Sequence, residues 1–367
     1  MRESLRIVVL GLSLSSSWGN GHATTFRALL RGLRGLGHDV LFLERDVPWY
    51  ASNRDLPAPD FCRLAFYDDL EALRGHHAAA IASADAVIVG SYVPDGIDVL
   101  DLVLRIARGT RVFYDIDTPV TLASLDRGDC AYIAPLQIPL LDLYLSFSGG
   151  RMLDRLARDY RARHPVAFYC AVDETRYRPG AGATRRWDLG YLGTYSEDRQ
   201  PALLRLLIEP ARRLPQQRFV VAGPQYPSDI DWPGNVERIE HLPPSEHPGF
   251  YAAQRYTLNV TRADMIAAGH SPSVRLFEAA ACGTPIISDD WDGLADLLPV
   301  GEAVLVAHSS GDVVWALQEM PEEQRSKFAA AARDIVLASH TGTARAAMLN
   351  DALDRVAAQS PRSLNPG

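Results

Sequence analysis

One segment of this sequence combines a helix start suited to anions with a carboxylate placed further along the same helix. It reads Ser271-Pro-Ser-Val-Arg-Leu-Phe-Glu-Ala-Ala-Ala-Cys-Gly-Thr-Pro-Ile-Ile-Ser288. Ser273 can cap a helix over residues 274–281, whose first turn would offer free amide groups to a diphosphate. Glu278 could then accept hydrogen bonds from two hydroxyl groups of a ribose. Helix chemistry alone fits an ordinary helix–strand connection equally well.

Arginine supplies nearly all of the positive charge, since Lys327 is the only lysine. Arg275 lies inside the segment just described, while Arg199 and Arg262 follow two other predicted strands. An arginine can offset the charge that develops on a departing diphosphate without a metal ion. For each of these three residues the alternative is a solvated ion pair at the surface.

Two residues of the N-terminal half are candidates for acid–base chemistry. His22 ends the stretch Trp18-Gly-Asn-Gly-His22, and a histidine can deprotonate a hydroxyl group at neutral pH. Its alternative role is to cap the following helix or line the loop. Asp117, in Asp115-Ile-Asp117-Thr-Pro119, could bind or deprotonate a hydroxyl group, but Asp117 or Thr118 could instead cap the next helix.

These residues lie close to the ends of short apolar runs, which are typical of buried parallel strands. Strands are expected at residues 5–10, 40–43, 86–90, 111–115, 143–148, 188–192, 218–222, 256–260 and 285–288. Helices are expected over residues 24–36, 96–108, 151–163, 201–213, 274–281, 329–338 and 343–357. The alternation predicts an α/β protein of two doubly wound, Rossmann-like domains, with ligands at the carboxyl ends of the strands.

The repeated pattern also predicts where the domains begin and end. We expect domains at residues 1–171 and 187–340, a linker at 172–186, and a C-terminal helix and tail at 341–367. The C-terminal helix could pack back on the first domain or against a second subunit, so the sequence leaves a monomer and a dimer open.

Composition excludes several classes of function. The net charge of −8 argues against a nucleic-acid partner, whose phosphates would be repelled. The four cysteines are scattered and the ten histidines lack metal-ligand spacing, which favours a cytoplasmic protein with reduced thiols and no metal site. No apolar run approaches the roughly 20 residues of a membrane span, and the run at 7–14 is interpreted as a strand, not a signal peptide.

The segment at 271–288 resembles the donor-binding motif of GT-B glycosyltransferases. Arg275, three residues before Glu278, is similar to the pattern of the CgeB-like (spore maturation protein-like) branch. Further stretches resemble the family in the same order: Val172-Asp173…Tyr177-Arg-Pro179, Gly190-Tyr-Leu-Gly-Thr-Tyr-Ser-Glu-Asp-Arg199 and Val221-Ala-Gly-Pro224. The resemblance implies two domains facing each other across a cleft, and sugar transfer from a nucleoside diphosphate, foremost a UDP-sugar, to a hydroxyl acceptor, with no cofactor or metal.

The resemblance also implies a role for each matching residue. Glu278 would hold the ribose, and Arg199 would be the main cation for the leaving group, aided by Arg262 and Arg275. The residues expected near the diphosphate and the base are Gly193, Thr194, Gly223, Leu242, Ser273 and Val274. The first domain would bind the acceptor through the loop that contains Gly19 and Gly21. His22 is at the position of the catalytic general base in some inverting relatives. Trp49, Tyr50 and Tyr92 could stack on sugar rings, although such residues more often pack in a core.

The sequence departs from the family at His270. Many retaining relatives carry a glutamate at this position, eight residues before the ribose-binding one. Resemblance to those relatives favours retention of configuration, whereas an essential base at His22 or Asp117 would favour inversion. Two other functions share the same donor site: a nucleotide-sugar epimerase and a scaffold that binds a nucleotide sugar without catalysis.

Overall fold

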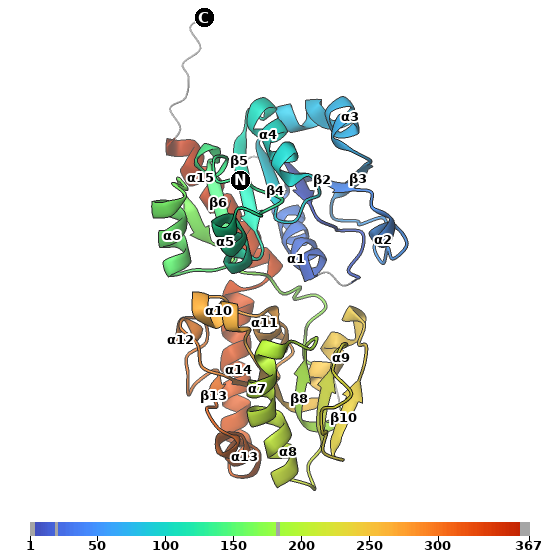
Figure 1. Ribbon diagram of the computed structural model, residues 1–367, viewed down its shortest axis with the longest axis vertical. Helices are drawn as coiled ribbons and strands as arrows, with labels where there is room; N and C mark the ends of the chain where they lie inside the picture. Colours follow the sequence, from blue (N-terminus) through green and yellow to red (C-terminus); the bar gives the residue numbers. More distant parts are fainter. Residues whose placement is uncertain (1–3, 19–20, 181–183, 360–367) are drawn as a thin grey trace, which may run out of the picture. The chain divides into compact units, whose positions relative to one another are not determined.

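The computed structural model describes residues 4–18, 21–180 and 184–359, which divide into two units (Figure 1). The first unit is formed by the described parts of 1–171 and 341–367, and the second by those of 172–340. Each unit is a parallel sheet with helices on both faces (Figure 1). The chain therefore passes from one unit to the other twice.

The first unit contains a seven-stranded parallel sheet of order β3-β2-β1-β4-β5-β6-β7. Its strands are β1 (Arg6–Gly11), β2 (Asp39–Arg45), β3 (Arg63–Tyr67), β4 (Ala86–Gly90), β5 (Thr110–Asp115), β6 (Leu143–Ser146) and β7 (Pro165–Ala167). Its helices are α1 (Gly21–Gly35), α2 (Pro48–Ala51), α3 (Leu70–Ser83), α4 (Gly96–Ile106), α5 (Thr118–Arg127), α6 (Arg151–Asp159), α15 (Gly342–Gln359) and the short η1 (Ile138–Leu140). The strand order reverses between β1 and β4.

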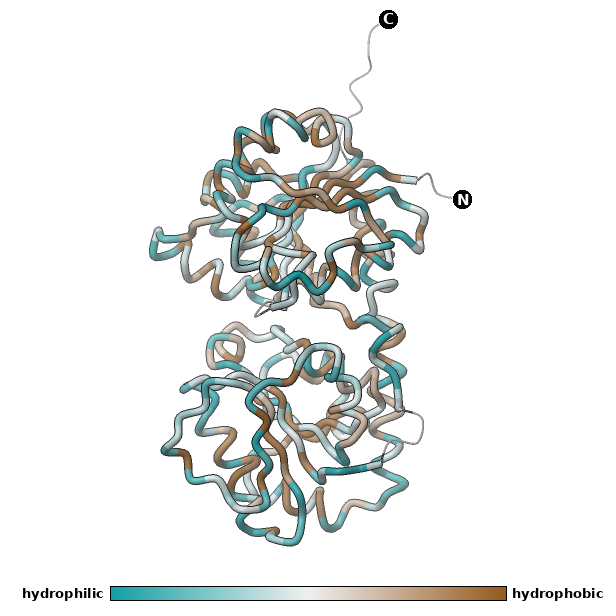
Figure 2. Tube along the Cα trace, turned by 90° about the vertical axis from the view of Figure 1, so that its right-hand side faces the viewer, coloured by the Kyte–Doolittle hydropathy of each residue, from teal (hydrophilic) through white to brown (hydrophobic). Residues whose placement is uncertain are grey.

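Alternate residues of β1 belong to different cores. Ile7 and Val9 pack with apolar residues of α1 and α15, whereas Val8 and Leu10 pack with those of α3 and α4. This division follows from the two-residue period of a strand, and Figure 2 shows the apolar strands running through the middle of each unit. Helices α1 and α15 approach so closely that a Cβ at Gly32 would stand 2.2 Å from the carbonyl oxygen of Gly342.

The second unit contains a six-stranded parallel sheet of order β10-β9-β8-β11-β12-β13. Its strands are β8 (Trp187–Leu192), β9 (Phe219–Ala222), β10 (Val236–Ile239), β11 (Gln254–Asn259), β12 (Ile286–Ser288) and β13 (Leu305–Val306). Its helices are α7 (Gln200–Leu203), α8 (Glu209–Arg213), α9 (His247–Ala252), α10 (Ala263–Ala268), α11 (Val274–Ala281), α12 (Leu294–Leu297), α13 (Ser310–Gln318), α14 (Glu322–Ser339) and the short η2 (Glu197–Arg199), η3 (Leu204–Ile208) and η4 (Pro244–Glu246). Both sheets have the strand order of dinucleotide-binding folds, so the predicted fold class is confirmed.

Some predicted elements differ from the structure. The helix expected over 201–213 is present, since residues 200–213 are helical without a break, but its middle, η3, is π-helical. This segment lies just before Pro210, which has no amide hydrogen for the regular helical bond. The strand expected at 143–148 ends at Ser146, because the Ser146 hydroxyl donates to the carbonyl of Ser148 in a local turn. No predicted range covers strands β3, β7 and β13 or helices α2, α3, α9, α10, α12 and α13.

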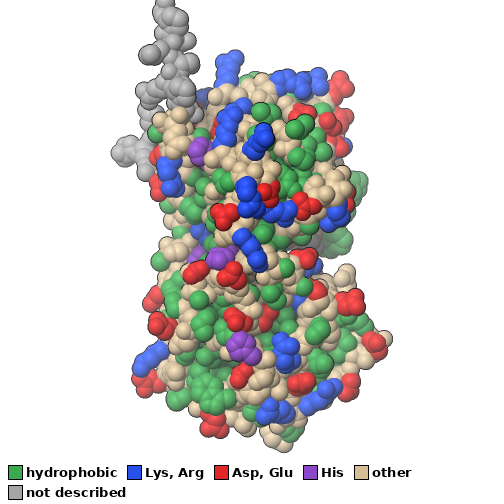
Figure 3. Space-filling view, turned by 60° about the vertical axis from the view of Figure 1, so that its left-hand side comes forward, with side chains coloured by type: hydrophobic (Ala, Val, Ile, Leu, Met, Phe, Trp, Pro, Cys, Tyr) green, Lys and Arg blue, Asp and Glu red, His purple; other side chains and the backbone are tan. Residues whose placement is uncertain are grey.

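The surface carries both signs of charge. On the face shown in Figure 3, arginine and lysine side chains are interspersed with aspartate and glutamate over both units. Among the described residues, no helix combines the length and the apolar character that crossing a bilayer requires.

Candidate functional site

Arg275 joins the carboxyl ends of β8 and β11, which are neighbours where the strand order of the second unit reverses. Ligands of doubly wound sheets bind at such a reversal. From α11, Nε of Arg275 donates to the carbonyl of Leu192 at 2.5 Å, and Nη1 donates to Oδ1 of Asn259 at 3.0 Å. The guanidinium lies 4.8 Å from the ring centre of Tyr191. Arg275 is therefore a buried, fixed cation at the reversal point.

Two glycines leave space beside this guanidinium. A Cβ at Gly193 would stand 3.0 Å from Nη2 of Arg275, and a Cβ at Gly223 would stand 2.1 Å from the carbonyl oxygen of Gly193. Gly223 also has a φ of 145°, which side chains rarely tolerate. The loops after β8 and β9 are thus in contact, and Thr194 follows Gly193 at an exposed position.

Arg275 and Arg262 each lie close enough to Arg199 for their charges to interact. Burial lowers the pKa of Arg199, and the positive charges of Arg275 and Arg262 lower it further. Nη2 of Arg199 donates to the carbonyl of Thr194 at 2.6 Å, while its buried Nε has no acceptor in the described part of the chain.

The three arginines form no salt bridge with a carboxylate of the described residues. Asp289 is near enough to interact with Arg275 through charge, but burial raises the pKa of that carboxyl group. Like charges repel at such distances, so a cluster of cations favours the binding of an anion. This part of the second unit is therefore suited to a phosphate-containing ligand.

Helix α11 begins beside this cluster. Ser273 caps the helix as predicted, since its Oγ accepts a hydrogen bond from the amide of Arg275 at 3.3 Å. In the chain that the structure describes, the amides of Ser273 and Val274 have no acceptor. Free amides at a helix start can bind an anion, and here the arginines lie next to them.

Glu278 lies on the buried side of α11 among three other side chains. Its Oε2 accepts a hydrogen bond from the hydroxyl of Tyr251 at 3.0 Å. The Tyr177 hydroxyl also donates to Glu278, and burial together with this nearby carboxylate raises the pKa of Tyr177. Nδ1 of His247 is 3.9 Å from Oε2 of Glu278, and its Nε2 is 3.3 Å from the carbonyl oxygen of Leu242. The His247 imidazole thus lies between Leu242, in the loop predicted to contact the nucleotide base, and Glu278, the residue predicted to contact the ribose.

His270 is held by acidic residues that follow β12. Its Nε2 lies 2.9 Å from Oδ2 of Asp296, and its amide donates to the carbonyl of Asp292 at 2.6 Å. The residue has a φ of 45°, and a Cβ at Gly293 would stand 2.6 Å from its ring. His270 is therefore fixed in the loop that leads into α11.

In the first unit, His22, Tyr92 and Asp117 lie together at the carboxyl edge of the sheet. The rings of His22 and Tyr92 meet edge to face with centroids 5.3 Å apart, and the Tyr92 hydroxyl donates to Oδ2 of Asp117 at 3.1 Å. Burial lowers the pKa of His22 to about 4, so its imidazole is neutral at pH 7. Asp117 occupies the N-cap position of α5, as one alternative expected, but its carboxylate makes no capping hydrogen bond to that helix.

Asp115, the other acidic residue of this motif, is fully buried. Its carboxylate accepts hydrogen bonds from the hydroxyls of Thr121 and Tyr144, each at 2.7 Å. Burial raises its pKa to about 6. Across the described ranges, no group of three or more His, Cys, Asp or Glu residues is arranged to hold a metal ion.

Comparisons with known proteins agree with this architecture. Residues 199–351 match the glycosyl transferase-like family. A sucrose-phosphate synthase from Thermosynechococcus elongatus has a similar structure, with a TM-score of 0.69 and 14% identity, over 97% of this chain and 100% of that one. The chain has the GT-B fold.

Two further solved GT-B structures are similar over nearly the whole chain. An alpha-glucosyltransferase in complex with UDP-glucose and DNA containing an abasic site has a TM-score of 0.70 and 12% identity, over 97% of this chain and 100% of that one. HepE from Anabaena in complex with UDP-glucose has a TM-score of 0.65 and 13% identity, over 96% and 100%. No curated protein matches the sequence.

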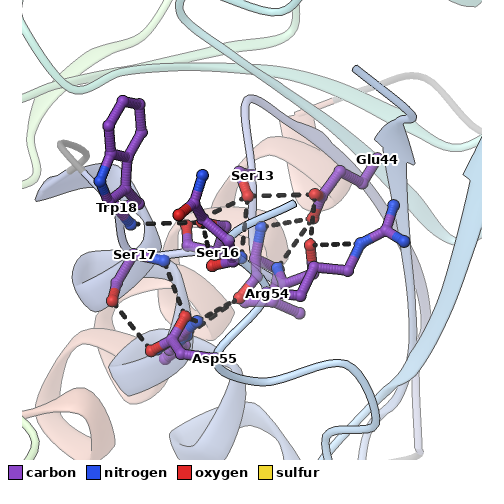
Figure 4. Close-up of polar contacts among 11 residues, drawn as sticks. Ser13, Ser16, Ser17, Trp18, Glu44, Arg54 and Asp55 are labelled. Carbon is purple, nitrogen blue, oxygen red and sulfur yellow. Dashed lines mark hydrogen bonds and ion pairs between the residues drawn. The ribbon is translucent and has the colours of Figure 1, made fainter. Parts of the chain in front are cut away.

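The loop between β1 and α1 of this GT-B chain carries the glycines predicted for the acceptor side. Gly19 lies outside the described residues, and Gly21 is the first residue of α1, with open space around it. The preceding residues, 13–18, are tied by hydrogen bonds to Glu44 of β2 and to Asp55 (Figure 4). This network was not foreseen, although a carboxylate at the end of an apolar strand was a possible signal.

Other residues around Glu278 and Arg275 of this GT-B chain were also missed. Tyr177 lies within the predicted linker motif and Asn259 ends a predicted strand, so both had a positional signal. Tyr251 and His247 had none, because both reach Glu278 only through the packing of α9 against α11.

Proposed function

We propose that this chain transfers a sugar from a UDP-sugar to a hydroxyl acceptor without a metal ion. The observation that carries the proposal is Arg275, buried between the ends of β8 and β11, with no carboxylate salt bridge in the described chain. Its charge interacts with that of Arg199, which also interacts with that of Arg262. A departing nucleoside diphosphate carries the charge that such a cluster stabilises.

Each part of a nucleoside diphosphate has a matching group in the second unit. The diphosphate would contact the arginines and the amides of Ser273 and Val274. The ribose would contact Glu278, whose Oε1 and Oε2 offer more acceptor positions than the two tyrosine hydroxyls occupy. The base would lie near Leu242. UDP is favoured because the alpha-glucosyltransferase and HepE structures of similar fold contain UDP-glucose.

The first unit would bind the acceptor hydroxyl at Asp117 and His22. A histidine whose pKa is about 4 is a weak base, so this environment supports a binding role for His22 more than proton removal. We therefore keep retention of configuration in the proposal, together with transfer of a hexose. Arg275 three positions before Glu278 is the feature that supports a CgeB-like relationship.

A binding screen tests the donor site. Calorimetric titration with UDP, GDP, ADP, dTDP and CDP, each with and without chelator, is made on the wild type and on Glu278→Ala. We expect one diphosphate to bind the wild type equally well with chelator and at least tenfold more weakly to the variant. If no diphosphate binds, or if the variant binds equally well, the donor site is wrongly assigned.

Turnover separates the enzymatic possibilities. The UDP-sugar selected by binding is incubated with the chain, and products are followed by phosphorus and proton NMR. Release of UDP that accelerates with an added hydroxyl acceptor supports transfer. Isomerisation of the donor alone would identify an epimerase, and tight binding without any turnover would identify a scaffold.

A further inference from the structure

Exposure changes abruptly along the loop that follows β1. Ser13, Leu14, Ser15 and Ser16 are fully buried, whereas the side chain of Trp18 is 57% exposed. Figure 4 shows the indole of Trp18 pointing away from the hydrogen-bonded residues that hold the loop. Single exposed apolar side chains are common on protein surfaces, so the feature that distinguishes Trp18 is the fixed loop that carries it.

Glu44 fixes the first half of this loop. Its carboxylate is 1% exposed and accepts hydrogen bonds from the Ser13 hydroxyl, the Leu14 amide, and both the amide and the hydroxyl of Ser15, at 2.6–3.0 Å. A buried carboxylate is tolerated only when it is satisfied in this way. The bonds leave the backbone of residues 14 and 15 little freedom.

Asp55 and Arg27 fix the second half. Asp55 accepts from the amide and the hydroxyl of Ser17 at 2.8 and 2.9 Å, and Arg27 donates to both carboxylate oxygens of Asp55. Burial alone would raise the pKa of Asp55, but the hydrogen bonds from Arg27 and Ser17 outweigh it and hold the pKa at about 2. The residue next to Trp18 is therefore anchored by a carboxylate that stays charged at neutral pH.

A second exposed tryptophan belongs to the same network. The Ser16 hydroxyl donates to the carbonyl of Asn53, and Nδ2 of Asn53 donates to the carbonyl of Trp49, which is 54% exposed on α2. Trp18 and Trp49 thus project from two segments that one set of hydrogen bonds holds together. On the same segment as Trp49, Asp46 pairs with Arg54, and Asn53 keeps its Oδ1 as an acceptor while its Nδ2 donates to the carbonyl of Trp49 and the hydroxyl of Ser52.

We propose that Trp18 and Trp49 stack on the rings of a saccharide acceptor. The inference rests on the proposed glycosyl transfer, because it names the class of its acceptor. The apolar face of a pyranose packs on an indole, while its hydroxyl groups need planar polar partners such as those beside Trp49. A membrane is the less favourable partner, because the chain has a net charge of −8.

A glycan array tests the acceptor class directly. The labelled full chain is compared as wild type, Trp18→Ala, Trp18→Leu, Trp49→Ala and Trp315→Ala. Trp315 is the matched control, since it is 49% exposed on α13 of the second unit. We expect saccharides to bind the wild type and Trp315→Ala alike, with at least tenfold weaker binding by Trp18→Ala and Trp49→Ala. Trp18→Leu keeps apolar area without an aromatic face and should fail as well.

Two further measurements separate this inference from the donor site. Titration with UDP should give the same Kd in all five proteins, because the tryptophan variants leave the second unit unchanged. Failure of the wild type to bind UDP would contradict the proposed sugar transfer. Saccharide binding by Trp18→Ala and Trp49→Ala as tight as by the wild type would overturn the stacking proposal alone. Failure of the wild type to bind any saccharide, or Trp18-dependent binding to vesicles of phosphatidylcholine and phosphatidylglycerol, would also overturn it.

Discussion

Gly223 lies against Gly193 so closely that a Cβ added to Gly223 would stand 2.1 Å from the Gly193 carbonyl oxygen. Gly223→Ala must therefore displace the loop after β8, and its φ of 145° adds strain. We expect binding of UDP to weaken at least tenfold and the melting temperature to fall. Gly234→Ala is the control, because a Cβ there would meet nothing within 4 Å. Equal affinity for UDP in Gly223→Ala and Gly234→Ala would show that the loop after β8 is not part of the donor site.

The hydroxyl of Tyr251 should determine how Glu278 contacts a ribose. Without the hydrogen bond at 3.0 Å, Tyr251→Phe leaves the carboxylate free to turn. A lost hydrogen bond to a charged group costs about 1.5–3 kcal/mol, so the wild type should prefer UDP over 2′-deoxy-UDP by roughly tenfold or more. We expect Tyr251→Phe to lose most of this preference. Tyr256→Phe is the control, because the buried Tyr256 hydroxyl has no acceptor in the described chain. This variant should keep the preference for UDP over 2′-deoxy-UDP.

Arg199 and Arg262 should act on the diphosphate and not on the nucleoside. Each substitution to alanine removes a cation from the cluster around Arg275, and we expect the Kd for UDP to rise about 10- to 100-fold. Uridine should bind unchanged in calorimetric titration. Arg218→Ala is the matched control, since this exposed residue lies just before β9, at the opposite edge of the sheet. A similar loss for uridine would contradict the assignment.

His22 should make the stability of the protein depend on pH. Its pKa in the folded protein is about 4, against 6.5 as the ordinary value, so the unfolded chain binds a proton first as the pH falls. The stability that the neutral imidazole contributes is complete above pH 6.5 and is lost between pH 6.5 and 4. At pH 5 the loss is about 2 kcal/mol. Urea unfolding of the wild type and His22→Asn should show this difference only in the wild type.

The same pKa bears on catalysis. If His22 removes the acceptor proton, kcat/KM should fall only as the pH approaches 4, and His22→Gln should abolish the reaction at every pH. If His22 only binds the acceptor, His22→Gln should raise the acceptor KM and leave kcat within a few-fold. Initial rates over pH 4–9 distinguish the two roles.

Glu44→Ala should release the loop after β1. The donors of Ser13, Leu14 and Ser15 would lose their acceptor, and each buried donor left unsatisfied costs about 1–3 kcal/mol. We expect lower stability and faster hydrogen exchange at residues 13–18, read out by mass spectrometry. Glu71→Ala, at an exposed position of α3, should change neither. Slow exchange in Glu44→Ala would mean that other contacts suffice.

The elements that the sequence predicts best have strong local signals. Strand β4 is buried at every position and reads as an apolar run, and α11 is bounded by the Ser273 cap and Gly283, whose φ is 71°. Strands β3 and β7 lie at the edges of their sheet and are partly exposed, so their residues lack such a pattern. The π-helical segment η3 within the predicted helix lies just before Pro210, and an apolar helical period gives no sign of such a local change.

The candidate site likewise contains residues that the sequence predicts and residues that it does not. Arg199 and Arg262 could be expected together, because each follows a strand of one sheet and parallel strands end at one edge. Arg275 could be expected beside them from the resemblance of its helix to the family motif. The partners of Glu278 could not, since Tyr177 and Tyr251 reach it from segments far apart in the sequence. Such contacts are fixed by packing, which no motif spacing encodes.

The return of α15 to the first unit sets an order for synthesis on the ribosome. Residues 1–171 emerge first, yet the apolar face of α1 that contains Leu29 and Leu33 is covered by α15, which is made last. The second unit is continuous in the chain and holds all the residues of its own core. It can therefore complete its fold while the first unit still waits for its final helix.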